Sequence, residues 1–206
     1  MSDRGQSADP RAERVRARLQ DAAFALSHER PVDGITVSDI VARADVSRQV
    51  FYRHYRDRDD AIARAFTRAF ADVAEPDGAE RDGAEPDGAD ARTRVLDLFA
   101  FAAAHASMCR NVVPSTVNQH VLTAYRDALA PPCRQIATQG MAVLDTVAAL
   151  REDAVTRFLV GGFLEVLRSW MEDPATTDLR ARVSATLDTV DALLGITSAQ
   201  KGPSNG

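Results

Sequence analysis

Arg48 and Gln49 stand side by side at the start of a short basic segment, and both side chains can recognise the edge of a DNA base. Arginine can donate two hydrogen bonds to guanine, and glutamine can pair with the N6 and N7 positions of adenine. Val50, the next residue, can contact a thymine methyl group. Ser47 is a favourable N-cap, so we expect these side chains to lie in the first turn of a helix that runs to His54. We expect the whole segment from Ser47 to His54, Ser47 included, to contact DNA.

A second short helix is predicted immediately before this one. Thr36 is a good N-cap, and Asp39 three residues later can complete a capping box. Apolar residues then follow at the spacing of one buried helical face, namely Val37, Ile40, Val41 and Ala44. Asp45 falls where the chain must turn, and aspartate tolerates the left-handed backbone better than most residues. The two segments together predict a helix-turn-helix, whose second helix enters the major groove.

The run from Gly34 to Ile62 also resembles the DNA-binding signature of the TetR (tetracycline-repressor) family of regulators. The residues that match this signature are Thr36, Ile40, Ala44, Val46, Ser47, Tyr52, His54 and the Arg58–Asp59 pair. Three residues depart from it: Asp45 replaces a turn glycine, Gln49 a frequent glycine and Tyr55 a phenylalanine. The resemblance implies that Thr36, Tyr52, His54 and Arg58 contact the phosphate backbone. The alternative is that they are ordinary surface residues of a helical bundle.

The charge of the chain is unevenly distributed. The 206 residues carry a formal net charge of -5, which does not by itself indicate nucleic-acid binding. Arginines nevertheless cluster in residues 11–18 and again in residues 48–58, and local patches set the field that a phosphate backbone meets. Arg14 and Arg18 are candidates for additional backbone contacts, or for a solvated helix face.

Cys109 and Cys133 are the two cysteines, and no CxxC pair occurs. This pattern argues against a disulfide scaffold or a structural zinc site and fits a reducing, cytoplasmic location. We expect no metal and no cofactor. No stretch approaches 18 uninterrupted apolar residues, so no membrane span is expected.

We predict an all-α fold with about nine helices, since no strand pattern occurs. The helices expected in the C-terminal half cover residues 91–110, 115–130, 133–150, 151–173 and 177–194, with Pro131-Pro132 ending one of them. The predicted division of the chain is a disordered tail (1–10), a three-helix helix-turn-helix domain (11–56), a connecting helix (57–73), an acidic Pro/Gly loop (74–90), a ligand-binding and dimerisation domain (91–196) and a second disordered tail (197–206).

The resemblance implies that a small molecule binds in the C-terminal domain. The apolar and polar candidates for its pocket are Phe66, Phe70, Phe99, His105, Met108, Asn118, Tyr125, Gln139, Phe158 and Glu165. For each of them the alternative is a packed core or an exposed helix face.

The resemblance further implies a homodimer in which the last two helices of each subunit form a four-helix bundle. The candidate interface residues are Gly161, Gly162, Val166, Trp170, Val183, Leu187, Val190 and Leu194. Alternatively, these residues fill the core of a single chain.

The predicted function is a homodimeric transcriptional repressor that binds a palindromic operator and is released by a small-molecule effector of unknown identity. One alternative is a helical small-molecule binding module that does not bind DNA. Another is a hydrolase that uses Cys109 or Cys133 with His105 or His120. The sequence contains no GxSxG, HExxH or nucleotide-binding glycine motif, which argues against an enzyme.

Overall fold

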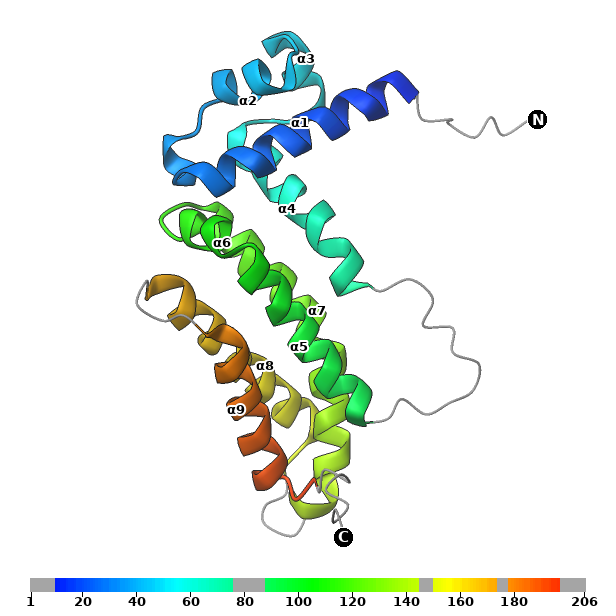
Figure 1. Ribbon diagram of the computed structural model, residues 1–206. Coiled ribbons are helices and arrows are strands. Elements are labelled where there is room, and N and C mark those ends of the chain that lie inside the picture. The colour runs from blue at the N-terminus through cyan, green and yellow to red at the C-terminus, as the bar shows by residue number, and fades with distance from the viewer. Residues whose placement is uncertain (1–9, 76–87, 145–149, 174–177, 197–206) are drawn as a thin grey trace, which may run out of the picture. The chain divides into compact units, whose positions relative to one another are not determined.

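The computed structural model describes residues 10–75, 88–144, 150–173 and 178–196. These residues form nine α-helices, one short 3-10 turn and no strand, which confirms the predicted all-α fold. The elements are α1 (Pro10–Glu29), η1 (Val32–Gly34), α2 (Val37–Ala44), α3 (Arg48–His54), α4 (Arg58–Ala74), α5 (Gly88–Ala104), α6 (Ala106–Val112), α7 (Val117–Leu144), α8 (Glu152–Glu172) and α9 (Leu179–Leu193) (Figure 1).

The chain divides into two compact units. The first comprises Met1–Asp72 together with His105–Ala124, and the second comprises Val73–Ala104 together with Tyr125–Gly206. The predicted C-terminal domain of residues 91–196 is therefore shared between them, because the segment that contains α6 packs with the N-terminal helices.

The first unit is built on α1, which contacts both α2 and α6. Leu19, Ala23 and Leu26 are buried on one face of α1, and Ile40 of α2 is completely buried as well. The side chain of Asn111 on α6 donates a hydrogen bond to the carbonyl of Ser27, at 2.9 Å. The helix-turn-helix is thus anchored to α1, and α1 is in turn tied to α6.

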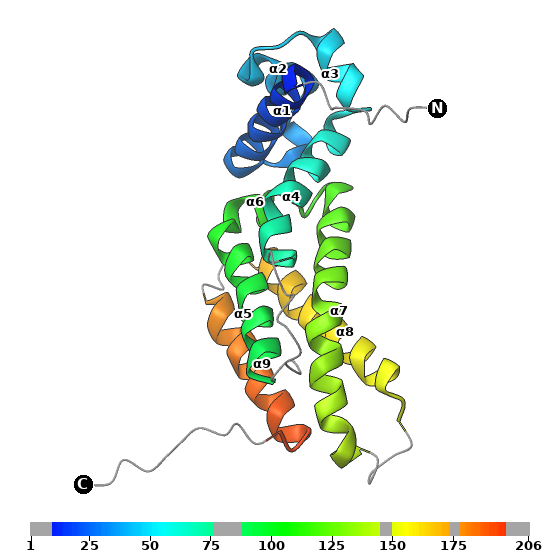
Figure 2. The ribbon, with the colours of Figure 1, turned by 90° about the vertical axis from the view of Figure 1, so that its right-hand side faces the viewer.

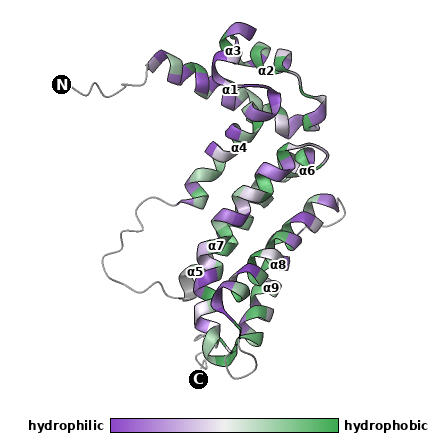
Figure 3. Ribbon diagram, turned by 180° about the vertical axis from the view of Figure 1, so that it is seen from behind, coloured by the Kyte–Doolittle hydropathy of each residue, from purple (hydrophilic) through white to green (hydrophobic). Residues whose placement is uncertain are grey.

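The second unit contains α5, α8, α9 and most of α7. The α9 helix packs against both α5 and α8, and α5 and α9 lie side by side in two perpendicular views (Figures 1 and 2). Hydrophilic and hydrophobic residues alternate along α8 and α9, as amphipathic helices require (Figure 3). Arg92 of α5 joins α9 through ion pairs with Asp188 and Asp191, at 2.6 and 2.9 Å.

The prediction that Pro131-Pro132 ends a helix was wrong, because α7 runs without a break through both prolines. Interior prolines destabilise a helix by about 3 kcal/mol or more, because they remove a hydrogen bond and crowd the preceding turn. The buried face of α7 nevertheless continues in register across them, through Tyr125, Leu129, Cys133, Ile136 and Ala137. Burial of this continuous stripe offsets the unfavourable local preference.

Several other boundaries differ from expectation. The predicted helix of residues 91–110 is two helices, since the chain departs from helical geometry at His105 (φ −111, ψ 33). The predicted tails and acidic loop lie largely outside the described residues, although Pro10 begins α1 and residues 88–90 belong to α5. None of the described helices has the length and hydropathy needed to cross a membrane.

Candidate nucleic-acid interface

The first helix of the motif, α2, is defined at both ends by the residues that the sequence indicated. The Thr36 hydroxyl accepts a hydrogen bond from the Asp39 backbone N–H at 3.2 Å, and the Asp39 carboxylate accepts one from the Thr36 N–H at 2.8 Å. The Thr36 hydroxyl also donates to the Asp39 carboxylate at 2.8 Å, and this bond, followed by the one from the Thr36 N–H, holds the pKa of Asp39 below its usual value. At the other end Asp45 adopts the left-handed conformation, with φ 50 and ψ 54. The predicted capping box and turn are both confirmed.

The second helix, α3, is held by very few side chains. Phe51 is fully buried, and Tyr55 directly after the helix is also buried. Ser47 caps the helix by accepting a hydrogen bond from the Val50 N–H at 3.3 Å. Since these residues attach the helix, most of its other side chains remain available for contacts outside the unit.

The outward face of α3 carries Arg48, Gln49, Tyr52 and Arg53, all of them exposed. Tyr52 is 56% exposed, which is high for so large an aromatic side chain. Val50 and His54 are partly buried at the sides of this face. An exposed helix with two arginines, an amide and a phenol suits both base edges and phosphates.

Arg53 was not among the predicted contact residues, although it lies on the same exposed face. The sequence did carry a signal for it: Arg53 follows the exposed Gln49 by four residues, and residues at this spacing share one side of a helix. We give the name reading face to Arg48, Gln49, Tyr52 and Arg53.

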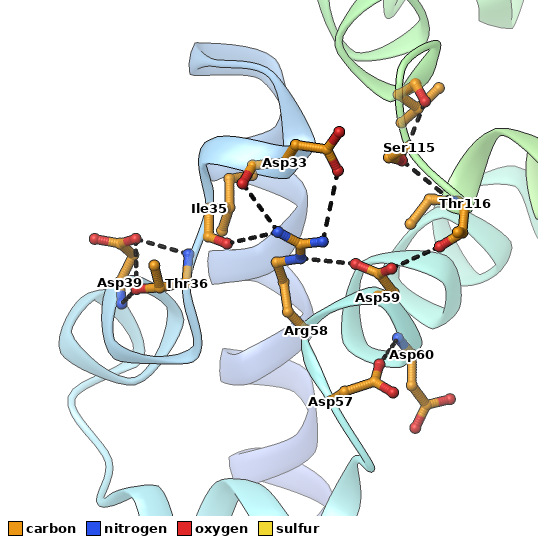
Figure 4. Close-up of polar contacts among 12 residues, drawn as sticks. Asp33, Ile35, Thr36, Asp39, Asp57, Arg58, Asp59, Asp60, Ser115 and Thr116 are labelled. Carbon is orange, nitrogen blue, oxygen red and sulfur yellow. Dashed lines mark hydrogen bonds and ion pairs between the residues drawn. The ribbon is translucent and has the colours of Figure 1, made fainter.

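Three further residues that were predicted to contact DNA, namely Thr36, Ser47 and Arg58, form hydrogen bonds within the first unit. The hydroxyl groups of Thr36 and Ser47 are engaged in the caps of α2 and α3. The Arg58 guanidinium donates to two backbone carbonyls and to Asp59, and 26% of its side chain is exposed (Figure 4).

The candidates for an effector pocket are distributed over both units. Phe66, Phe70, His105, Met108 and Asn118 belong to the first unit, and Phe99, Tyr125, Gln139, Phe158 and Glu165 belong to the second. Within the second unit, the buried Phe99 ring contacts Tyr125 and Phe163, while Gln139, Phe158 and Glu165 are exposed. The structure therefore does not bring these last three residues together with the aromatic core of their unit.

The candidates for a dimer interface fall into two groups. Trp170, Val183, Leu187 and Leu194 are buried within the single chain, and Val166 and Val190 are partly buried. By contrast, Gly161 and Gly162 are exposed on α8, and a Cβ atom added to either would meet nothing within 4 Å. Phe158, one turn before them, is 76% exposed.

Cys109 and Cys133 are both buried, and burial raises the pKa of each thiol to about 12. A cysteine nucleophile reacts as the thiolate, which these surroundings strongly disfavour. This environment argues against the alternative of a cysteine hydrolase.

Comparison with known proteins identifies the N-terminal unit. Residues 19–65 match the family model of bacterial regulatory proteins of the tetR family. No curated protein matches the sequence closely enough to count as a relative.

Solved structures with the same fold cover most of the chain. A TetR transcriptional regulator from Streptococcus agalactiae 2603V is 16% identical, with a TM-score of 0.60 over 87% of this chain and 95% of that one. The fatty acid degradation regulator FadR from Bacillus halodurans is 18% identical, with a TM-score of 0.62 over 96% and 100%. A putative transcriptional regulator from Pseudomonas aeruginosa PAO1 is 23% identical, with a TM-score of 0.57 over 93% and 95%.

A capped helix-turn-helix with an exposed basic reading face, followed by a helical second unit, defines a DNA-binding transcriptional regulator. Residues 19–65 match the family model of tetR bacterial regulatory proteins, so the helix-turn-helix segment of this chain is of the tetR type. The resemblance noted in the sequence is thereby confirmed.

Proposed function

We propose that the protein is a homodimeric repressor that binds a palindromic operator through the reading face of α3. The observation that carries this proposal is that α3 has one buried and one exposed side. Phe51 is fully buried and attaches the helix to the unit, while Arg48, Gln49 and Tyr52 are exposed. Arg48 and Gln49 lie in the first turn, from which side chains of a recognition helix reach base edges. Tyr52 and His54 contact the phosphate backbone beside them.

Dimerisation follows from the need to read two half-sites. Recognition helices of a two-fold dimer bind half-sites about 34–36 Å apart, one turn of DNA. The exposed side of α8 around Gly161 and Gly162 has room for the close approach of another helix. Phe158 on the same side supplies apolar area that a partner subunit can bury.

Release by a small molecule completes the proposed cycle. The effector binds more tightly to the form of the dimer whose two α3 helices do not match the operator spacing. Equal affinity for both forms would shift no population, however tight the binding.

Selection of duplexes from a random pool tests the central claim. The purified protein is expected to enrich an inverted repeat whose half-site centres are separated by about one helical turn. Footprinting on the DNA upstream of its own gene then locates the natural operator. Failure to enrich any sequence, at low as well as moderate salt, would favour a helical ligand-binding module without DNA-binding activity.

A further inference from the structure

The Arg58 side chain, at the first residue of α4, is the centre of a polar network within the first unit (Figure 4). Its Nη1 donates hydrogen bonds to the carbonyls of Asp33 and Ile35, both at 3.1 Å. Its Nε donates to Asp59 Oδ1 at 2.7 Å, and Nη2 lies 3.6 Å from Asp33 Oδ1. These contacts engage most of the donors that a guanidinium possesses.

The two carbonyls that Arg58 binds lie at the corner that leads into α2. Ile35 directly precedes Thr36, which is the N-cap of α2, and Asp33 belongs to the 3-10 turn before it. Arg58 therefore ties the start of α2 to the start of α4. Because α2 leads through the tight turn at Asp45 into α3, the position of this corner affects the position of the reading face.

Asp59 in turn holds the guanidinium, and Thr116 holds Asp59. The Thr116 hydroxyl donates to Asp59 Oδ2 at 2.6 Å, so the two carboxylate oxygens serve different partners. Burial acts to raise the pKa of Asp59, but the hydrogen bonds from Arg58 and Thr116 outweigh burial, and the pKa lies below its ordinary value. The carboxylate is thus charged at neutral pH and fixed at both oxygens.

We propose that Arg58 is a positioning residue for DNA recognition, held in place by Asp59 and Thr116, and that its charge is not used to bind a phosphate. The inference rests on the proposed DNA-binding function. A phosphate contact requires a guanidinium that points outward, whereas this one is turned toward backbone carbonyls at the corner before α2. An ammonium cannot replace the planar fork that reaches several acceptors at once.

The test uses the full-length protein and a duplex that the wild-type protein has selected from a random pool. Arg58→Lys keeps the charge but loses the fork, Arg58→Gln removes the charge, and Thr116→Val removes only the hydroxyl that fixes Asp59. Arg64→Lys and Arg64→Gln are matched controls, because Arg64 lies on the same helix and pairs with Asp60 outside this network. Affinity is measured over a range of salt concentrations, at a temperature where circular dichroism shows every variant to be folded.

A positioning role predicts that Arg58→Lys weakens binding about tenfold or more, and that Thr116→Val weakens it about two- to tenfold. It also predicts that Arg58→Gln leaves the salt dependence as steep as in Arg64→Gln. Wild-type affinity of Arg58→Lys would overturn the inference, because a lysine satisfies a simple phosphate contact. A salt slope reduced by about one in Arg58→Gln alone would also overturn it. If the wild-type protein selects no duplex, the proposed function fails instead, and this inference fails with it.

Discussion

Arg48 illustrates how the proposed interface separates recognition from stability. Its side chain is exposed in the first turn of α3, whereas the attachment of that helix depends on Phe51 and Tyr55, which are buried. Loss of the Arg48 side chain should therefore change DNA binding without unfolding the protein.

We predict that Arg48→Ala weakens binding to the selected duplex by about 1–3 kcal/mol and relaxes the preference at one base pair in each half-site. The measurement compares the affinity of the variant and the wild type for duplexes with single base-pair changes. Arg134→Ala on the exposed side of α7 is the control and should bind like the wild type. An equal loss for every duplex would show that Arg48 contacts a phosphate and reads no base.

Asp45 is the one non-glycine residue with a positive φ among the described residues. A left-handed backbone costs ordinary residues about 1–2 kcal/mol, and aspartate and asparagine less. Its ion pair with Arg18, at 3.2 Å, is strongly exposed and contributes little stability.

Two substitutions at Asp45 should therefore have opposite effects. Glycine adopts the left-handed conformation without steric cost, so Asp45→Gly is expected to raise the free energy of unfolding by about 0.5–1 kcal/mol. Asp45→Ala removes the locally favourable side chain without relieving the backbone and should lower the free energy of unfolding by a similar amount. Urea denaturation measures both; stabilisation by alanine would show that the turn relaxes out of the left-handed region.

At the scale of elements, the sequence predicted best those features that depend on near neighbours. The caps of α2 and α3 each join residues three positions apart, so their patterns are visible in the sequence. The continuation of α7 through Pro131-Pro132 depends on packing of the whole buried stripe, which local proline preference cannot reveal. Likewise, the partners of Arg58 lie up to 25 residues away and Thr116 lies 57 residues from Asp59, so no short motif indicated that network.

The contact between α1 and α6 contains a pair of histidines that was also not predicted. His28 Nε2 lies 3.0 Å from His105 Nδ1, and His28 Nδ1 lies 2.8 Å from the carbonyl of Phe24. Since a carbonyl only accepts, His28 Nδ1 must carry a proton, and in the neutral pair His28 Nε2 accepts from His105 Nδ1–H. The pair retains its hydrogen bond with one added proton but loses it with two, because both facing nitrogens would then be donors.

This pair predicts a stability that falls in mild acid. Burial, and then the positive charge of His28, lower the pKa of His105 below its ordinary value of 6.5. A histidine whose folded pKa is depressed stabilises the fold above the unfolded pKa, and this contribution is lost as the pH falls through the folded pKa. The free energy of unfolding should therefore decrease below about pH 6.5, the ordinary pKa of histidine, in addition to the effect of the carboxylates.

His105→Gln isolates this contribution, because glutamine can still bond His28 but does not titrate. Urea unfolding of the variant and the wild type at pH 8 and pH 5 provides the comparison. The wild type is expected to lose more stability between the two pH values than the variant. Equal losses would mean that His105 is protonated as easily in the folded protein as in the unfolded chain.

At the scale of the whole molecule, the proposed function requires two copies of the chain, and the second unit offers one surface suited to their contact. The side of α8 that carries Phe158, Gly161 and Gly162 is exposed in the single chain. The buried face of the same helix is occupied by residues such as Phe163 and Trp170, which fill the core of the unit. The exposed side can therefore be changed without disturbing that core.

Gly162→Arg tests this surface. An added side chain meets nothing within 4 Å in one chain, and arginine favours the helix by about 1 kcal/mol over glycine, so the subunit should fold. In a dimer packed through α8, the arginine would place a charge between closely approaching helices. We expect the wild type to sediment as two chains and Gly162→Arg as one, with unchanged helical circular dichroism.

Affinity for the operator should fall when the dimer is lost. Since the reading face is intact, Gly162→Arg should retain weak binding to a single half-site but lose the additional affinity for the inverted repeat. Ala100→Arg on the exposed side of α5 is the control and should remain dimeric. A Gly162→Arg protein that still sediments as two chains would show that the subunits associate through a surface that excludes this part of α8. The two α3 helices would then have to reach one operator from a different arrangement of the subunits.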